Sequence, residues 1–171
     1  MENNDSKPPS TISIEQQGMP EIGISEILGL VELLKGKGGK EDIYKLAAEL
    51  NMEFGHVLSV IRAAEILKLV HTPGGDVVLE DMGDKISKAK ISHRKSLIKD
   101  QIAGIAVFKK VSDFLNTKEE REAPRGEVLD VLAELLPNQN AEHSFSTIVN
   151  WGRYAELFGY NDDRETFYLD V

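Results

Sequence analysis

Apolar side chains recur three or four positions apart through most of the chain after residue 20. This spacing is typical of amphipathic helices, and it predicts six of them, over residues 24–34, 41–50, 53–68, 92–116, 125–136 and 141–158. The third and the sixth helix are each followed by two short apolar runs around a turn, at Pro73 to Asp76 and at Asn161 to Glu165. Such runs predict β-hairpins.

Three helices followed by a hairpin are the order of a winged helix-turn-helix, and the chain contains this order twice. The predicted fold class is therefore mainly α with short β-hairpins, as tandem duplicated winged helix-turn-helix units joined by a long helix. Ser92 is the expected N-cap of that long helix. The predicted organisation is a disordered tail over 1–20, a first unit over 21–81, a basic helical bridge over 82–96 and a second unit over 97–171.

Short sequence matches support a duplication. Ala48-Glu49-Leu50 and Ala133-Glu134-Leu135 match at an offset of 85 positions, and Arg62-x-Ala64-Glu65 and Arg153-x-Ala155-Glu156 match at an offset of 91. Leu79-Glu80 and Leu169-Asp170 match at an offset of 90. Arg and Glu three positions apart are neighbours on a helix, so we expect an ion pair in each copy that caps and orients the following hairpin.

Composition narrows the class of protein. Of the 171 residues, 41% are apolar, which is enough to build real cores, and none is cysteine. The chain therefore has no disulfide framework, thiol nucleophile or Cys-ligated zinc, as is typical of a reducing compartment. It has no apolar run long enough for a membrane span, and its first residues lack the pattern of a signal peptide. We expect a cytoplasmic protein without membrane insertion.

Charge is unevenly distributed along the chain. The net charge is −9, which argues against a general nucleic-acid binder because phosphates attract Lys and Arg. Between Asp84 and Lys110, however, eight basic residues face only two acids. The sequence describes an acidic body with a basic middle.

Four segments resemble the AAA-associated C-terminal domain. They are residues 27–34, 42–50, 63–67 and 151–158, the last of which reads WGRYAELF. The resemblance covers about residues 20 to 171. This domain is appended to ATP-binding subunits of ABC transporters of the nitrate, sulfonate and taurine importing type, so the resemblance implies an accessory, regulatory module. The ATPase domain that usually precedes the module is not in this chain, so we expect a separate subunit with a protein partner, such as an ABC-type ATPase.

The sequence offers no site for chemistry. Gly36 to Glu41 lacks the Gly-x-x-x-x-Gly-Lys-Ser/Thr pattern of a phosphate loop and follows a helix instead of a strand. Asn161 to Asp163 lacks the alternating acids of a calcium loop. The histidines are isolated, without a second ligand at useful spacing: His56, His71, His93 and His143. We expect no enzyme activity, no catalytic residue, no cofactor and no metal.

Aromatic residues near the C-terminus are the candidates for partner binding. Trp, Tyr and Arg are the residues that anchor protein interfaces. The candidates are Trp151, Arg153, Tyr154, Phe158 and Tyr160. The alternative interpretation places Trp151 and Tyr154 in a core or between the two units.

DNA binding is the alternative function, because winged helices place their third helix in the major groove. The candidate contacts are His56, Ser59 and Arg62 on the first such helix and Lys85, Lys88, Lys90, Arg94, Lys95 and Lys99 in the bridge. The second such helix offers His143, Thr147, Asn150 and Arg153. Glutamates lie beside these residues and neither hairpin turn is basic, so we prefer protein interaction. The bridge is then a solvated face that attracts the acidic body.

Overall fold

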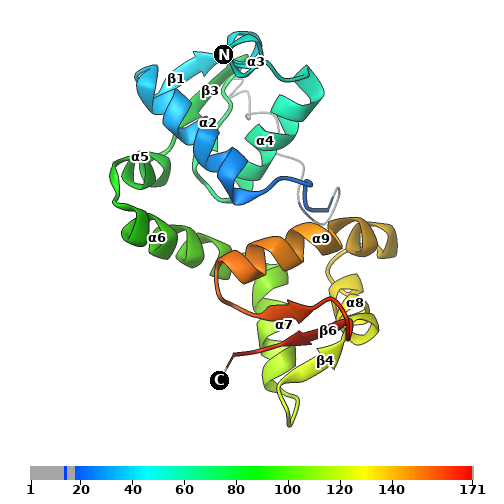
Figure 1. Cartoon of the computed structure of the whole chain (residues 1–171). Helices are drawn as coiled ribbons and strands as arrows, with labels where there is room; N and C mark the ends of the chain where they lie inside the picture. Colours follow the sequence, from blue (N-terminus) through cyan, green and yellow to red (C-terminus); the bar gives the residue numbers. More distant parts are fainter. Residues whose placement is uncertain (1–13, 15–17, 171) are drawn as a thin grey trace, which may run out of the picture.

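Two halves of similar build lie one above the other and are joined along one side by two helices (Figure 1). The computed structural model describes residue 14 and residues 18–170. In these residues the chain forms eight helices and six short strands, and the strands make two three-stranded antiparallel sheets. A mainly helical fold with small β elements is thereby confirmed. No helix in the described part of the chain has the length and apolar character of a membrane span.

The first half packs three helices around a small sheet. Its elements are α2 (Ile24–Gly36), β1 (Lys40–Asp42), α3 (Ile43–Leu50), α4 (Phe54–Ile66), β2 (Val70–His71) and β3 (Asp76–Leu79). Strand β3 lies between β1 and β2. The apolar stripe of α2, with Ile27, Val31 and Leu34, is buried and faces α4 and the sheet. Burial of this stripe at helical spacing is the main force that holds the half together.

The second half repeats this order of elements. They are α7 (Ala106–Asn116), β4 (Glu122–Pro124), α8 (Arg125–Ala133), α9 (Asn138–Tyr154), β5 (Gly159–Asn161) and β6 (Thr166–Tyr168), with β6 between β4 and β5. Aromatic rings fill the centre of this half. The Phe158 ring lies 6.3 Å from that of Phe108 and 5.7 Å from that of Phe167, and all three side chains are buried.

Backbone hydrogen bonds recur in the two halves at fixed offsets. The Ile43 N–H donates to the Gly75 carbonyl, and the Arg125 N–H donates to the Glu165 carbonyl. The donors are 82 positions apart and the acceptors 90. The Leu79 N–H to Gly39 carbonyl bond likewise recurs at Leu169 and Arg121, with 90 positions between donors and 82 between acceptors. The second helices therefore correspond at an offset of 82, and not at the 85 that the sequence match gives.

The ends of α4 and α9 correspond at an offset of 88. Lys68 and Glu156, 88 positions apart, both adopt a left-handed backbone, with φ of 59° and 55°. The next residue in each half, Leu69 or Leu157, donates its N–H to Ala64 or Gly152. Arg153 therefore corresponds to Glu65 and not to Arg62, so the offset of 91 is wrong. A shift of three residues nearly preserves a helix face, which is why the apolar pattern tolerated the misalignment.

The joining helices are α5 (Asp81–Lys88) and α6 (Ile91–Ala103). The single long helix predicted over 92–116 is wrong, because the chain breaks at Gly104 and Ile105 before α7 begins. Lys90, and not Ser92, is the N-cap of α6. Apolar spacing continues across the break from Ile102 to Phe108, since both helices bury that side, and so the pattern concealed the change of direction.

Strands β1 and β4 were not predicted. The second helix, expected from residue 41, begins at Ile43, and Asp42 caps it by accepting hydrogen bonds from the N–H groups of Tyr44 and Lys45. Pro124, expected in the first helical turn, is extended and ends β4. Neither strand lies beside a hairpin turn that could reveal it, because β1 pairs with β3 and β4 pairs with β6, both far along the chain.

Candidate interaction surfaces

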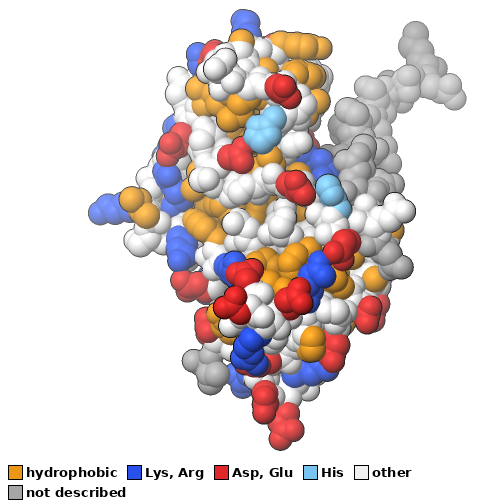
Figure 2. Space-filling model, turned by 45° about the vertical axis from the view of Figure 1, so that its right-hand side comes forward, with side chains coloured by type: hydrophobic (Ala, Val, Ile, Leu, Met, Phe, Trp, Pro, Cys, Tyr) orange, Lys and Arg blue, Asp and Glu red, His pale blue; other side chains and the backbone are white. Residues whose placement is uncertain are grey.

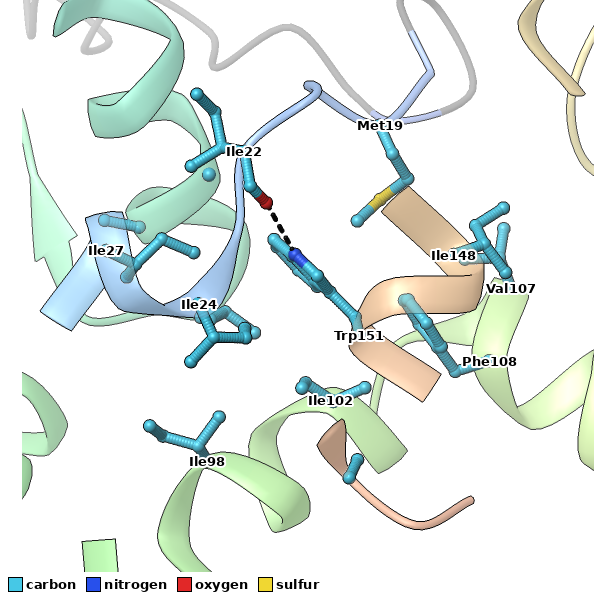
Figure 3. Close-up of a cluster of buried hydrophobic side chains, with 14 of the residues drawn as sticks. Met19, Ile22, Ile24, Ile27, Ile98, Ile102, Val107, Phe108, Ile148 and Trp151 are labelled. Carbon is cyan, nitrogen blue, oxygen red and sulfur yellow. Dashed lines mark hydrogen bonds between the residues drawn. The ribbon is translucent and has the colours of Figure 1, made fainter. Parts of the chain in front are cut away.

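Trp151 lies where the two halves meet. Its side chain is fully buried, stacks on Phe108 with 6.1 Å between ring centroids, and points toward Ile22 and Ile24 at the start of the first half (Figure 3). Its indole Nε1 donates a hydrogen bond of 2.8 Å to the carbonyl of Ile22. Of the two interpretations of Trp151, the structure matches the one that places it in packing between the units.

Two more of the aromatic candidates are also buried. Phe158 and Tyr160 lie in the core of the second half, where the Tyr160 ring is 4.8 Å from that of Phe167. Gly152 leaves room for this arrangement, since a Cβ atom there would overlap the Phe158 ring. Trp151, Phe158 and Tyr160 therefore form no aromatic patch on the surface of this structure.

Arg153 and Tyr154 remain accessible, but both contact other parts of the chain. Arg153 donates to the carbonyl of Tyr160 and to Asp162 Oδ2, the latter at 3.1 Å, which ties α9 to the last hairpin. The ring of Tyr154 has Lys95 Nζ 5.8 Å from its centroid. These contacts orient the hairpin and the bridge against α9.

The predicted ion pairs between Arg and Glu three positions apart are replaced by others. Arg153 pairs with Asp162, whereas Glu156 pairs with Lys95 at 2.8 Å. The hydrogen bond and the charge of Lys95 lower the pKa of Glu156. In the first half, Arg62 donates to a backbone carbonyl and Glu65 accepts a hydrogen bond of 2.6 Å from the Thr72 hydroxyl.

Residues 18–22, here called the strap, cross between α4 and α9. The predicted tail over 1–20 lies outside the described residues except for Ile14 and 18–20, and Met19 is fully buried. Four hydrogen bonds hold the strap's backbone. They run from Met19 N to Ser144 Oγ (2.7 Å), from Thr147 Oγ1 to the Pro20 carbonyl (2.9 Å), from Trp151 Nε1 to the Ile22 carbonyl and from Arg62 to the Gly18 carbonyl (2.7 Å).

The candidate DNA contacts of α4 face this junction. His56 Nε2 lies 2.6 Å from Glu26 Oε2, Ser59 donates to the Gly55 carbonyl, and burial lowers the pKa of Arg62. With Met19, Pro20, Glu21, Ile22, Leu58 and His143, these three side chains line a cleft of about 550 Å³. Thr147 of α9 is also buried. In this structure the strap bonds to Arg62 at one end of this face of α4, whereas His56 stays exposed beside the cleft.

Half of the candidate cations in the bridge form ion pairs. Lys88 lies 2.7 Å from Asp84, Arg94 lies 2.8 Å from Glu32, and Lys95 pairs with Glu156. Within the described residues no ion pair involves the other three, Lys85, Lys90 and Lys99. The pairs of Arg94 and Lys95 attach the bridge to acids of both halves.

A pair of stacked, exposed aromatic rings was not predicted from the sequence. The rings of Tyr44 and Phe54 stack in the first half, with centroids 5.0 Å apart and an interplanar angle of 7°, although 71% of Tyr44 and 39% of Phe54 are exposed. With Met52 they form what we call the aromatic patch, beside a hollow of about 720 Å³. Figure 2 shows hydrophobic side chains gathered over the upper end of the molecule. The sequence contained one indication of this pair: Tyr44 lies outside the apolar stripe of its helix, so its ring was not needed for the core.

Potential metal ligands do not gather. Among the described residues no three His, Asp or Glu side chains come close enough to hold an ion. The expectation that the protein has no cofactor or catalytic residue stays a prediction.

The structure defines a class of protein: a helical module with two small sheets. The strap lies between its two halves, and an aromatic patch is exposed on the first half. The model of the C-terminal AAA-associated domain family matches residues 44–161. The chain therefore belongs to this family, as its resemblance indicated. The match begins in α3 and ends in β5, so it includes parts of both halves and the bridge. No curated protein and no solved structure matches the chain.

Proposed function

We propose that the protein is a non-enzymatic accessory module that binds and regulates an ATPase. Membership of the AAA-associated family carries this proposal. The resemblance to modules appended to the ATP-binding subunits of nitrate, sulfonate and taurine type ABC transporters suggests the kind of partner.

We infer further that the halves are duplicated winged helix-turn-helix units. In support, both halves have the order helix, strand, helix, helix, strand, strand, with the last strand in the middle of the sheet. The matching backbone hydrogen bonds and left-handed residues of the two halves also favour a duplication. In this interpretation the third helices serve packing between the units.

The aromatic patch is the surface that we assign to the ATPase partner. Exposed aromatic rings are unfavourable in water, and a large flat ring buried at an interface contributes strongly to binding. The position that corresponds to Tyr44 in the second half, 82 residues later, is Gly126, so the stack has no counterpart there. Only the first half therefore offers this anchor.

Binding to a purified ATP-binding subunit of a nitrate, sulfonate or taurine type transporter from the same organism tests the proposal. Tyr44→Ala combined with Phe54→Ser is expected to weaken binding at least about tenfold, because two interface anchors are lost. Ile91→Ser is the matched control, since Ile91, on α6, is the most exposed large apolar side chain of the described residues, at 86%. ATP hydrolysis by the subunit, measured with and without the protein, tests regulation.

The outcomes separate two parts of the proposal. If wild-type protein neither binds the subunit nor changes its ATPase rate, the proposed partner is wrong. If it binds and the double variant binds equally well, the partner is retained and the aromatic patch is rejected as the contact.

A further inference from the structure

The groove between α4 and α9 is built to hold a short backbone segment. Ser144, Thr147 and Trp151 are three and four positions apart, so they share one face of α9, and each forms a hydrogen bond with the strap. Ser144 and Thr147 are the two polar side chains that are buried among the described residues. Buried polar groups need partners, and the strap supplies them.

The strap's own residues suit the groove. Gly18 has a φ of +74°, and a Cβ atom there would press on the Ser144 hydroxyl, so this position requires glycine. Pro20 has no N–H group and offers only the carbonyl that Thr147 needs. Met19 and Ile22 bury their side chains, while Glu21 is exposed. The groove therefore suits a five-residue segment with glycine at the first position, an apolar residue at the second, proline at the third, any residue at the fourth and an apolar residue at the fifth.

The strap is attached in a way that permits release. Among the described residues, its backbone forms no backbone-to-backbone hydrogen bond with α4, α9 or a strand: Gly18 N–H donates to the Ile14 carbonyl, and Ile22 N–H donates to the Pro20 carbonyl at 2.9 Å. The cleft beside it, lined by His56, Arg62 and His143, leaves its outer side open. Arg62 Nε is buried there without a hydrogen-bond partner among the described residues, so a donor is left over in the groove.

We propose that this groove is a peptide-binding site, that the strap occupies it as a releasable intramolecular ligand, and that a partner segment of the form Gly-apolar-Pro-x-apolar takes its place. This inference does not depend on the aromatic patch or on the identity of the ATPase. A tethered strap has a high effective concentration, so it excludes a free segment until it is weakened or pulled away.

Binding of a labelled peptide to full-length variants tests the site. The probe is a fluorescent, acetylated peptide of residues 18–25. Met19→Ser with Ile22→Ser weakens the strap, and this variant is expected to bind the probe about 100-fold more tightly than wild type, because the competing tethered segment is lost. The control Glu21→Gln changes an exposed strap residue and should behave as wild type. Adding Thr147→Val to the strap variant should weaken the probe about fivefold, since one hydrogen bond is removed.

Trp151 reports whether the strap has left, because the chain has one tryptophan. Its emission should shift to the red in the strap variant and return when the probe binds. A strap variant that shows the native emission and no probe binding overturns the proposal. If Thr147→Val does not change the affinity for the probe, the proposal is also overturned, since the peptide would then lie elsewhere.

Amide hydrogen exchange on wild-type protein gives a second test that needs no variant, in case the strap variant does not fold. Release of the strap predicts that the Met19 amide exchanges at least about 100-fold faster than the buried amides of α9, through a local opening. Equal protection of Met19 and α9 would mean that the strap leaves only on global unfolding, and the proposal would be abandoned.

Discussion

Equivalent residues tie each third helix to the hairpin behind it by opposite chemistry. Glu65 accepts a hydrogen bond from Thr72, whereas Arg153, 88 positions after Glu65, donates to the carbonyl of Tyr160, 88 positions after Thr72. The helix residue accepts the hydrogen bond in the first half and donates it in the second, but the two bonds join corresponding positions of the chain. The geometry of the hairpin, and not the identity of the residue, is what the two halves share.

Gly152, the one glycine of α9, is expected to be sensitive to substitution. In Gly152→Ala the new Cβ would overlap the buried Phe158 ring, which is confined by Phe108 and Phe167, so we expect a loss of about 1 to 3 kcal/mol in the free energy of unfolding. Gly29→Ala is the control: Gly29 lies inside α2 with no atom within 4 Å of the added Cβ, and alanine there should stabilise by about 0.5 to 1 kcal/mol. Urea unfolding measures both, and equal effects would contradict the placement of Phe158.

At the scale of elements, the start of α3 depends on one side chain. Asp42 accepts hydrogen bonds from two N–H groups at the first turn, so Asp42→Ala should lower the free energy of unfolding by about 1 kcal/mol. Asp42→Asn keeps an acceptor and should cost only a small part of that. Urea midpoints compare the two, and a similar loss in both would mean that the charge, and not the cap, is responsible.

The contact between α2 and α5 should be sensitive to acid. Hydrogen bonds from Lys35 and Lys88 lower the pKa of Asp84 below its usual value of 3.8. A lowered carboxyl pKa stabilises the folded state at pH above the usual value, and this contribution disappears as the pH falls through the lowered one. Asp84→Asn should therefore lose less stability than wild type on acidification below about pH 5.

Asp81→Asn provides the comparison for that experiment. Asp81 also lies in the first turn of α5, so both substitutions remove a charge from the same helix end, but Asp81 has no ion pair among the described residues. Unfolding free energies of wild type and both variants are measured between pH 7 and pH 3, because only Asp84→Asn removes the ion pairs with Lys35 and Lys88. The same slope in wild type and Asp84→Asn would contradict the prediction.

The spacing of apolar residues predicted the helices better than it predicted where the chain changes direction between them. The helices that bury a stripe at helical spacing were found from sequence, because burial imposes the spacing. The break at Gly104 and Ile105 was not, since α6 and α7 bury the same side. Strands β1 and β4 were missed because their pairing partners are β3 and β6, far away in the chain.

At the scale of the molecule, the site could be predicted less well than the fold. The residues around Trp151 were recognised as distinctive, but the segment that covers them starts 133 positions earlier, at Gly18, in what reads as a polar tail. Hydrogen bonds between side chains and distant backbone leave no local pattern. The aromatic patch was missed for a related reason: Tyr44 and Phe54 meet only after α3 and α4 have folded against each other.

The charge of the whole molecule predicts weak DNA binding. With a net charge of −9, and with Lys88, Arg94 and Lys95 in ion pairs, we expect any binding to random duplex DNA to disappear near 0.15 M salt. Lys85, Lys90 and Lys99 are the candidates without ion pairs among the described residues. Replacing all three with glutamine should abolish DNA binding at low salt. Fluorescence anisotropy measures this, and sequence-selective binding that persists at that salt concentration would restore the DNA hypothesis.

The middle position of β6 has a consequence for synthesis of the chain. Strand β6 pairs with β4 on one side and β5 on the other, so neither of these earlier strands has its partner until Tyr168 has been made. The ring of Phe167, on which Phe158 and Tyr160 pack, arrives equally late. The first half can close its sheet as soon as Leu79 has emerged from the ribosome, whereas the second half must wait, with its aromatic core open, until Tyr168 has emerged.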